Sequence, residues 1–224
     1  MTAIETKLAG SGWRSRAVYR VVRTILAVFL ALWCRLHVEG SENIPATGPF
    51  ILAPTHRSII DTPVASAVTR RRMRFLGADK WWSNKWFGRL LSALGGFPVS
   101  RGKADREALR RCIGVLTVGE PLVLFPEGER KSGPLVLPLR DGAAYIAVKS
   151  GVSIVPVGIG GSERVMPRGA NWIKPRKIVA LVGKPITVEI DESERFPRAA
   201  VRDLTLLLHE ELQRLFDAAQ VRAG

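Results

Sequence analysis

Short apolar runs alternate with helical patterns along most of this chain, and this alternation constrains its fold more than any other feature. Gly, Pro or charged residues separate each run from a stretch whose apolar side chains recur every three or four positions. Such alternation is typical of α/β domains, in which helices connect parallel strands and cover the sheet. We therefore predict a single α/β domain with a largely parallel β-sheet flanked by helices. Strands are expected at residues 50–54, 73–78, 122–125, 152–160 and within 177–190, and helices at about 61–69, 81–95, 103–119, 141–151 and 197–216.

The N-terminal segment begins basic and becomes strongly apolar. Its uncharged run, residues 24–34, has about half of the roughly 20 residues that a membrane-spanning helix needs. If the segment is helical, Arg16, Arg20 and Arg23 share one face. We predict that residues 1–37 contain an amphipathic helix that associates with a membrane surface.

On this interpretation the three arginines meet lipid phosphates, while Ile25, Leu26, Phe29 and Leu30 enter the acyl region of the bilayer. Residues 38–224 then form the single domain. The alternative is a helix that packs on this domain as part of its core, because apolar runs of this length are often buried in protein.

The chain is strongly basic, with 34 Lys and Arg against 20 Asp and Glu and a formal net charge of +14. Such a surface attracts nucleic acid, an anionic membrane surface or phosphorylated small molecules. The basic residues are spread out and aromatic residues are not interleaved with them, so we expect no specific nucleic-acid partner. The two cysteines form no CxxC pattern and histidines are few, which indicates neither a disulfide framework nor a metal site.

The residues that directly follow the apolar runs are the first candidates for a functional site. In parallel α/β sheets, ligands bind beyond the carboxyl ends of the strands. The segments at these positions are Thr55–Arg57, Ser100–Arg101, Pro126–Arg130 and Val157–Gly158. We therefore predict a site at one edge of the sheet.

His56 and Asp61 lie in the first segment and its continuation, HRSIID. In one continuous helix, residues five apart point about 140° away from each other. If His56 lies in a loop and Asp61 in the first helical turn, the carboxylate can fold back onto the imidazole. It would then fix the tautomer and leave the other ring nitrogen free to take a proton from a hydroxyl group. The alternative is an aspartate that caps its own helix and a histidine held by backbone groups.

Charged residues after two other apolar runs suggest an anionic substrate. Arg101, Lys103 and Arg130 are candidates for binding it, because guanidinium groups grip phosphate in a bidentate manner. Glu127 ends an apolar strand, where a carboxylate needs a partner; it either holds acceptor hydroxyls or anchors an arginine of the site. Gly128 would let the backbone approach a ligand closely.

Other common reaction schemes lack their motifs. The sequence GGSER at 160–164 departs from the GxSxG nucleophile motif at its last position, and neither a Walker A nor a GxGxxG sequence is present. A direct transfer, in which His56 activates an acceptor alcohol, fits the residues that remain.

Four segments, HRSIID, GGFPVSR, FPEGER and IVPVG, occur in the order of the four motifs of the glycerolipid acyltransferases. Over about residues 38–190 the chain resembles this family, and most closely its bacterial 1-acyl-glycerol-3-phosphate acyltransferases. The resemblance implies transfer of a fatty acyl group from an acyl thioester to the free glycerol hydroxyl, at sn-2, of 1-acyl-glycerol-3-phosphate, giving phosphatidic acid. The donor would be acyl-coenzyme A or an acyl carrier protein, without cofactor, metal or acyl-enzyme. The enzyme would act at the cytoplasmic face of the cell membrane as a monotopic or peripheral protein.

The resemblance also assigns roles to individual residues. His56 becomes the general base, and Asp61 orients and charge-balances it. The other functional positions of the family map onto Arg101 for the acceptor phosphate, onto Glu127 and Gly128 with Arg130 as their basic partner, and onto Pro156, next to Val157, on the acyl-donor side.

One position departs from the family pattern. The third motif more often reads EGTR, and here Glu129 stands in place of the threonine. A carboxylate there would repel a phosphomonoester unless it faces away or pairs with Arg130 or Lys131. A lysophospholipid with a larger head group, or another polar lipid, is therefore an alternative acceptor. Two further alternatives are an acyl thioesterase, in which His56 activates water, and an inactive relative that only binds lipid.

Overall fold

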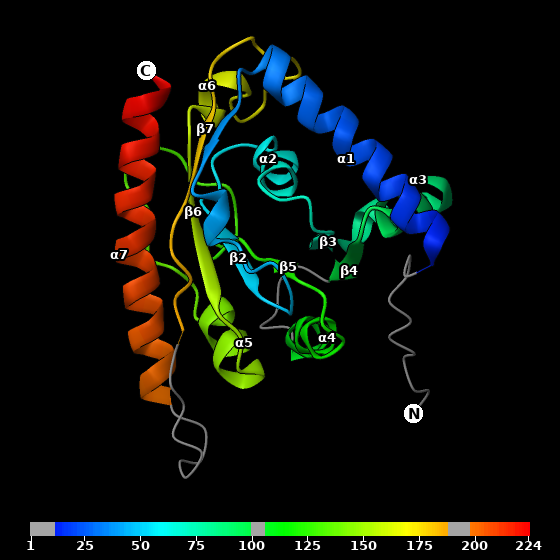
Figure 1. The fold of residues 1–224 in the computed structure, drawn as a ribbon, viewed down its shortest axis with the longest axis vertical. Helices are drawn as coiled ribbons and strands as arrows, with labels where there is room; N and C mark the ends of the chain where they lie inside the picture. Colours follow the sequence, from blue (N-terminus) through cyan, green and yellow to red (C-terminus); the bar gives the residue numbers. More distant parts are fainter. Residues whose placement is uncertain (1–11, 100–105, 188–197) are drawn as a thin grey trace.

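The computed structural model describes residues 12–99, 106–187 and 198–224, whose strands form one seven-stranded sheet (Figure 1). The strand order is β1-β7-β6-β2-β5-β3-β4, and all neighbours run parallel except β6 and β7. The predicted α/β fold with a largely parallel sheet is therefore confirmed. The strands are β1 (His37–Glu39), β2 (Ile51–Pro54), β3 (Arg74–Ala78), β4 (Gly96–Val99), β5 (Leu122–Val123), β6 (Ile154–Gly160) and β7 (Val179–Val182).

Helices cover both faces of this sheet (Figure 1). One face packs against α1 (Trp13–Trp33), α2 (Asp61–Ala67) and α6 (Ser162–Val165). The other packs against α4 (Arg106–Thr117), α5 (Gly142–Ser150) and α7 (Arg198–Ala223). The remaining helices are α3 (Lys85–Ala93), which lies beside β4, and the 3-10 helices η1 (Ser41–Asn43) and η2 (Asp79–Trp82).

The central strand β2 shows why its sequence is continuously apolar. Ile51 and Ala53 pack with the α4, α5 and α7 side chains, whereas Leu52 packs with those of α1 and α2. All three side chains are fully buried. A strand covered on both faces does not alternate between apolar and polar residues, and β2 therefore carries its polar groups only in the loop after Pro54.

Strand β6 agrees with the strand predicted at 152–160. Val157 and Gly158, which were also expected to follow a strand end at Pro156, lie within it because β6 continues to Gly160. Residues Ile154–Val157 pair with β2, and residues Val157–Gly160 pair with β7. The expectation is wrong because the ladder passes from one neighbouring strand to the other, which keeps the segment extended. Strand β1 was not predicted, and β5 is shorter than expected.

Helix α1 packs on the domain through one of its faces. Arg23 donates from Nε and Nη2 to carbonyl oxygens at the end of α2, at 2.9–3.2 Å, and so binds groups that a helix end leaves unpaired. Leu30 is buried in the core. The prediction that Arg23 and Leu30 face lipid is therefore wrong, whereas Ile25 and Phe29 are exposed as expected.

Helix α7 crosses directly over β6 at two glycines. A methyl group at Gly158 would overlap the backbone of Leu215 and Phe216, and one at Gly160 would overlap the backbone of Ala219. We expect Gly158→Ala to lower the free energy of unfolding by about 1–3 kcal/mol, because overpacking forces the helix away from the sheet. Urea denaturation followed by circular dichroism measures this change.

Gly114 in α4 provides the matched control for this substitution. No atom lies within 4 Å of a methyl group built at Gly114, and alanine inside a helix is favoured over glycine by about 0.5–1 kcal/mol. Gly114→Ala should therefore leave stability unchanged or raise it. An unfolding midpoint of Gly158→Ala equal to that of Gly114→Ala would contradict the close crossing.

Candidate active site

The loop between β2 and α2 carries His56 at the carboxyl end of the sheet. Thr55 is fully buried and fixes the start of this loop: its N–H donates to the Val157 carbonyl at 3.0 Å, and its Oγ1 accepts from the Ile159 N–H at 3.0 Å. Pro156 and Val157, predicted on the acyl-donor side, are buried inside the sheet. In this structure Val157 holds the strand end that presents His56.

His56 and Asp61 form a hydrogen-bonded pair, with 3.1 Å between Nδ1 and Oδ2. Asp61 begins α2 and is fully buried. Its Oδ2 also accepts the N–H groups of Arg57 and Ser58, both at 2.6 Å. The aspartate thus folds back onto the loop before its own helix, as the first of the two interpretations predicts.

The imidazole ring of His56 is fixed on two sides. An ionised carboxylate only accepts hydrogen bonds, so Asp61 holds a proton on Nδ1. The ring of Phe125 stacks on the imidazole, with centroids 3.9 Å apart and planes at 23°. The side chain of His56 is still 16% exposed. In the neutral tautomer Nε2 then carries the free lone pair, which suits it to accept a proton.

Glu127 lies in the buried turn after β5 and is 2% exposed. Its carboxylate accepts from Arg57 Nη1 at 2.6 and 2.9 Å and from the His56 N–H at 2.9 Å. The expected pairing of Glu127 with Arg130 is therefore wrong. A carboxylate enclosed by these donors anchors an arginine, which was one of its two predicted roles, and links β5 to the His56 loop.

Sequence reasoning placed Arg57 in a candidate site segment but assigned it no role. Its guanidinium lies 4.7 Å from the ring centroid of Phe216, and its Nη2 donates to the Leu135 carbonyl at 3.0 Å. The residue is 2% exposed, which is rare for arginine unless it is paired. The signal was present in the sequence, since a carboxylate at the end of an apolar strand requires a partner.

Gly128 adopts a positive φ of +75°, which favours glycine. The space beside it is occupied by the guanidinium of Arg140, which a methyl group at position 128 would meet. The close approach of a ligand to this glycine stays a prediction. Arg140, which the sequence reasoning did not single out, lies beside it.

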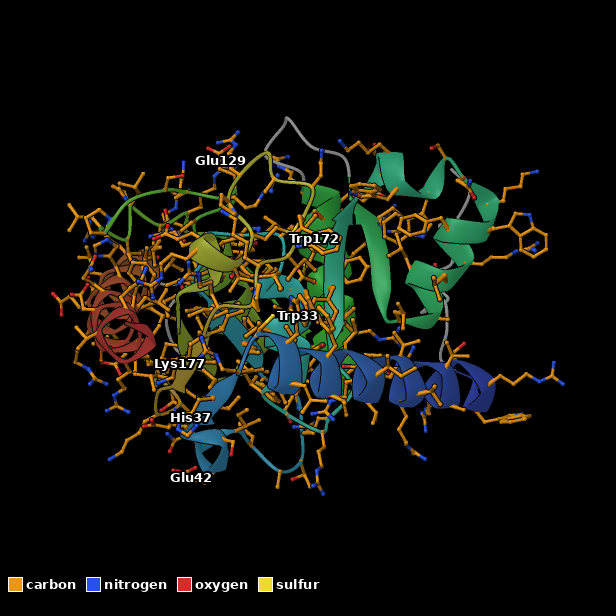
Figure 2. All side chains as sticks on the ribbon, turned by 90° about the horizontal axis from the view of Figure 1, so that it is seen from above. Trp33, His37, Glu42, Glu129, Trp172 and Lys177 are labelled. Atoms are coloured by element: carbon orange, nitrogen blue, oxygen red, sulfur yellow. The ribbon has the colours of Figure 1, made fainter. Side chains whose placement is uncertain are left out.

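Glu129 is exposed and pairs with Lys131, whose Nζ lies 2.7 Å from Oε1. This hydrogen bond and the positive charges of Lys131, Arg140 and Arg168 hold the pKa of Glu129 below its usual value. Figure 2 shows Glu129 at the outer edge of the molecule. The charge of Glu129 is thus balanced by Lys131 in the same loop, which is one of the arrangements predicted to weaken its repulsion of a phosphomonoester.

Of the three predicted phosphate-binding cations, the structure describes Arg130. Arg101 and Lys103 lie outside the described residues, between the end of β4 at Val99 and the start of α4. Arg130 is half-buried and forms no ion pair with another described residue. Because β2, β5, β3 and β4 run parallel, the ends of β4 and β2 belong to the same edge of the sheet.

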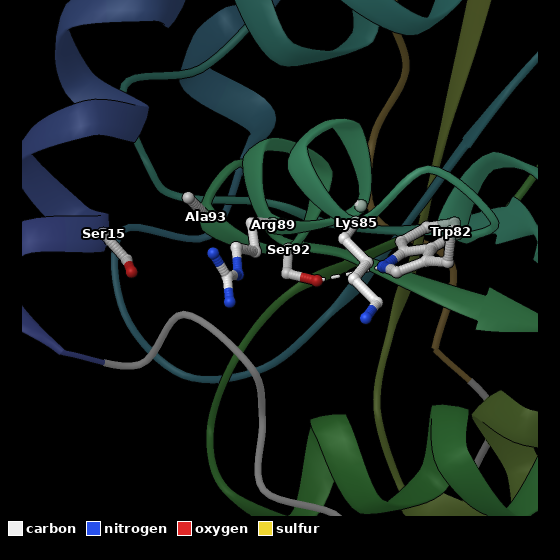
Figure 3. A pocket seen from close by; sticks show the side chains of 7 residues that line it. Ser15, Trp82, Lys85, Arg89, Ser92 and Ala93 are labelled. Atoms are coloured by element: carbon white, nitrogen blue, oxygen red, sulfur yellow. Dashed lines mark hydrogen bonds between the residues drawn. The ribbon is translucent and has the colours of Figure 1, made fainter.

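A hollow of about 440 Å³ lies between α1 and α3, away from this loop (Figure 3). Trp82, Lys85, Arg89 and Ser92 contribute to its wall, and the Trp82 indole N–H donates to Ser92 Oγ at 3.0 Å. None of the predicted site residues contributes to it. The His56 loop, and not this hollow, is therefore the candidate active site.

Comparison with known proteins identifies the family of this chain. The family model described as Acyltransferase matches residues 35–160. A 1-acyl-sn-glycerol-3-phosphate acyltransferase of Bacillus subtilis is 28% identical over 170 residues, or 75% of this chain and 82% of that protein. The chloroplastic 1-acyl-sn-glycerol-3-phosphate acyltransferase LPAT1 of Arabidopsis thaliana is 26% identical, and the match covers 68% of this chain but only 44% of that protein.

A solved structure shows the same fold. The crystal structure of the 1-acyl-sn-glycerophosphate acyltransferase PlsC from Thermotoga maritima superposes with a TM-score of 0.73 and 27% identity, over 94% of this chain and 83% of that chain. The matched family region contains the whole β2–α2 loop, the β5 turn and most of the sheet. The chain is a member of the acyltransferase family.

Proposed function

We propose that this acyltransferase moves a fatty acyl group from an acyl thioester to the free glycerol hydroxyl, at sn-2, of 1-acyl-glycerol-3-phosphate, giving phosphatidic acid. The observation that carries the proposal is the imidazole of His56, which the buried Asp61 holds at Nδ1 and which is still 16% exposed. Relatives named for this reaction, with the same fold, supply the substrate class.

In the proposed reaction His56 acts as general base. Its Nε2 takes the proton of the acceptor hydroxyl while the hydroxyl oxygen attacks the thioester carbonyl carbon. The tetrahedral adduct then expels the thiolate, the carbon–sulfur bond breaks, and the imidazolium returns the proton to sulfur. Asp61 stabilises the positive imidazolium and keeps the ring in place. The donor is acyl-coenzyme A or an acyl carrier protein.

We propose that the acceptor phosphate binds among the cations at this edge of the sheet. Arg101 and Lys103 remain proposed for this role. Arg130 and Arg140 add positive charge beside the β5 turn. The pairing of Glu129 with Lys131 removes the main objection to a phosphomonoester, because a balanced carboxylate repels an anion weakly. A lysophospholipid with a larger head group stays the second candidate.

We also propose that the protein binds peripherally to the cytoplasmic face of the membrane through α1. In the described ranges no helix is long and apolar enough to cross a membrane. The outward face of α1 carries Val21, Ile25, Val28 and Leu32, which are 51–78% exposed. Figure 2 shows α1 along one side of the molecule, with Trp33 and the exposed Trp172 near its end. An exposed apolar stripe of this kind inserts into the interface of a bilayer.

Thiol release from palmitoyl-coenzyme A in detergent micelles tests the proposed reaction. We expect release that depends on added 1-acyl-glycerol-3-phosphate and is at least tenfold slower with lysophosphatidylcholine. Equal rates with both acceptors would shift the proposal to a broader lysophospholipid acyltransferase. Release at the same rate without any acceptor would contradict acyl transfer and indicate a thioesterase.

A further inference from the structure

A second hollow, of about 700 Å³, lies at the opposite end of the sheet from His56. Its wall is formed by α1, by the connector between α2 and β3, and by the turn that precedes β5. β3 and β5 begin here, whereas His56 follows the end of the parallel strand β2. Six arginines line the hollow: Arg16, Arg20 and Arg23 from α1, and Arg70, Arg71 and Arg72 from the connector.

Two of these arginines form the frame of the hollow. Arg23 donates to carbonyl groups at the end of α2. Arg71 donates from Nη1 to the Pro45 carbonyl at 2.8 Å and from Nη2 to the Gly48 carbonyl at 2.5 Å. Carbonyl groups satisfy the N–H donors but carry no net charge, so both cations still contribute their full positive charge to the hollow.

Arg72 has buried donors without an acceptor. Its Nη2 donates to the Ala93 carbonyl at 3.0 Å, but Nε and Nη1 are buried and form no hydrogen bond with any described residue. Its guanidinium lies over the ring of Tyr19, 5.7 Å from the centroid. Leaving buried donors of a charged group unpaired costs free energy that a bound acceptor would recover.

The positive charge of the hollow is not balanced by its own acids. Among the described residues of its wall, Glu120 is the single acid, and it pairs with Arg74. Burial lowers the pKa of Arg72 most, and the positive charge of Arg74 lowers it further, whereas Glu120 and Tyr19 raise it less. Arg16, Arg20 and Arg70 are exposed and form no ion pair with another described residue.

We propose that this hollow is a second anion-binding site, which takes a phosphate group through the exposed guanidinium groups of Arg16, Arg20 and Arg70 together with Arg72 of the same wall. Guanidinium groups bind phosphate oxygens in a bidentate manner, with charge-assisted hydrogen bonds. The site is separate from the proposed catalytic loop, because the two lie at opposite ends of the sheet.

The position of α1 makes a lipid head group one source of this phosphate. Consecutive helical residues lie 100° apart, so Arg20 and Thr24 flank the exposed Val21 and Ile25 on the helix surface. A bilayer that receives the apolar stripe would bring its phosphates level with the hollow. A lipid source of the phosphate rests on the proposed membrane binding. A soluble phosphate compound is the other source of a phosphate group for this site.

A charge-conserving substitution tests the site most sharply. Arg72→Lys keeps the positive charge but loses the forked pair of donors. Arg14→Lys, on the exposed side of α1, is its matched control. We expect Arg72→Lys to weaken binding about five- to tenfold and Arg14→Lys to change it less than twofold. Circular dichroism and thermal unfolding confirm that each variant is folded.

Two probes distinguish the source of the phosphate. Calorimetric titration with inorganic pyrophosphate measures binding of a soluble anion. Flotation with phosphatidylcholine vesicles, with and without 20 mol% phosphatidylglycerol, measures binding of head groups. Weaker binding of either probe in the Arg72→Lys variant, but not in Arg14→Lys, supports the site. The probe that is affected identifies the source of the phosphate. Equal behaviour of Arg72→Lys and Arg14→Lys with both probes would overturn it.

A second set of variants covers the case in which Arg72→Lys does not fold. Arg16→Gln/Arg20→Gln/Arg70→Gln removes three charges from the hollow, and Lys184→Gln/Arg198→Gln/Arg202→Gln removes three exposed charges elsewhere. We expect at least a tenfold loss of binding only in the first triple variant; equal losses would overturn the proposal. All binding is measured without acyl donor or acceptor, so failure of the proposed reaction would leave these results unaffected.

Discussion

Replacing His56 with alanine is expected to lower kcat for acyl transfer by about 10²–10⁴-fold, the range that a positioned general base contributes. No other described side chain is held by Asp61 in the same way. The KM values for donor and acceptor should change little, because the imidazole takes the proton of the acceptor hydroxyl and is not proposed to bind either substrate. Initial rates of acceptor-dependent thiol release at saturating donor measure the effect.

His37 provides the control for this substitution. It is exposed, and its ring hydrogen-bonds Glu39 in β1, which β7 and β6 separate from β2 in the sheet. His37→Ala should keep the rate of the unchanged protein within about twofold. A His56→Ala variant that is folded and retains more than a tenth of the wild-type kcat would refute the assigned role.

Glu127→Gln is expected to reduce the free energy of unfolding by about 3–5 kcal/mol, because it leaves the buried guanidinium of Arg57 without a counter-charge. The carboxylate and guanidinium are both nearly inaccessible to water and lie 2.6 Å apart. The pair also holds the backbone of His56, so activity should fall together with stability. Urea denaturation at neutral pH measures the change.

Two variants sharpen this result. Glu129→Gln changes an exposed carboxylate two residues away and should cost less than about 1 kcal/mol, as exposed ion pairs do. Arg57→Met/Glu127→Gln removes both charges, and we expect it to be more stable than Glu127→Gln alone. If Glu127→Gln unfolded at the same urea concentration as Glu129→Gln, the buried pair would not stabilise the fold.

The order of strands and helices was predictable from local patterns, because continuous apolar runs and helical periodicity report burial directly. The closing helix shows this most clearly: Val201, Leu204, Leu208, Leu212 and Leu215 recur every three or four positions, and all five are buried. Strand β1 was missed because its three residues, HVE, carry no such pattern. It exists only through its pairing with β7.

The candidate site was predictable in its residues but only partly in its contacts. The sequence indicates that His56 and Asp61 can meet, and that Glu127 needs a partner. It does not indicate that Arg57 is this partner, because their contact depends on β2 and β5 being neighbours with Leu52 opposite Val123. A local motif cannot report a register between strands about 70 residues apart.

The faces of α1 were predicted only in part, for a related reason. Its pattern is apolar almost all round after residue 24, so periodicity alone does not decide which side packs on the domain. Arg23 faces the domain because it donates to carbonyl groups at the end of α2, and Leu30 faces it because it packs in the core. What remains outside is the stripe that contains Val21, Ile25, Val28 and Leu32.

The most direct test of the account is whether His56 acts as a base or as a nucleophile. The protein is incubated with palmitoyl-coenzyme A and radiolabelled free coenzyme A, without any acceptor. Direct attack by the acceptor hydroxyl predicts that no label enters palmitoyl-coenzyme A, while added 1-acyl-glycerol-3-phosphate still yields phosphatidic acid. Label that enters the thioester without acceptor would show an acyl-enzyme and contradict the proposed mechanism.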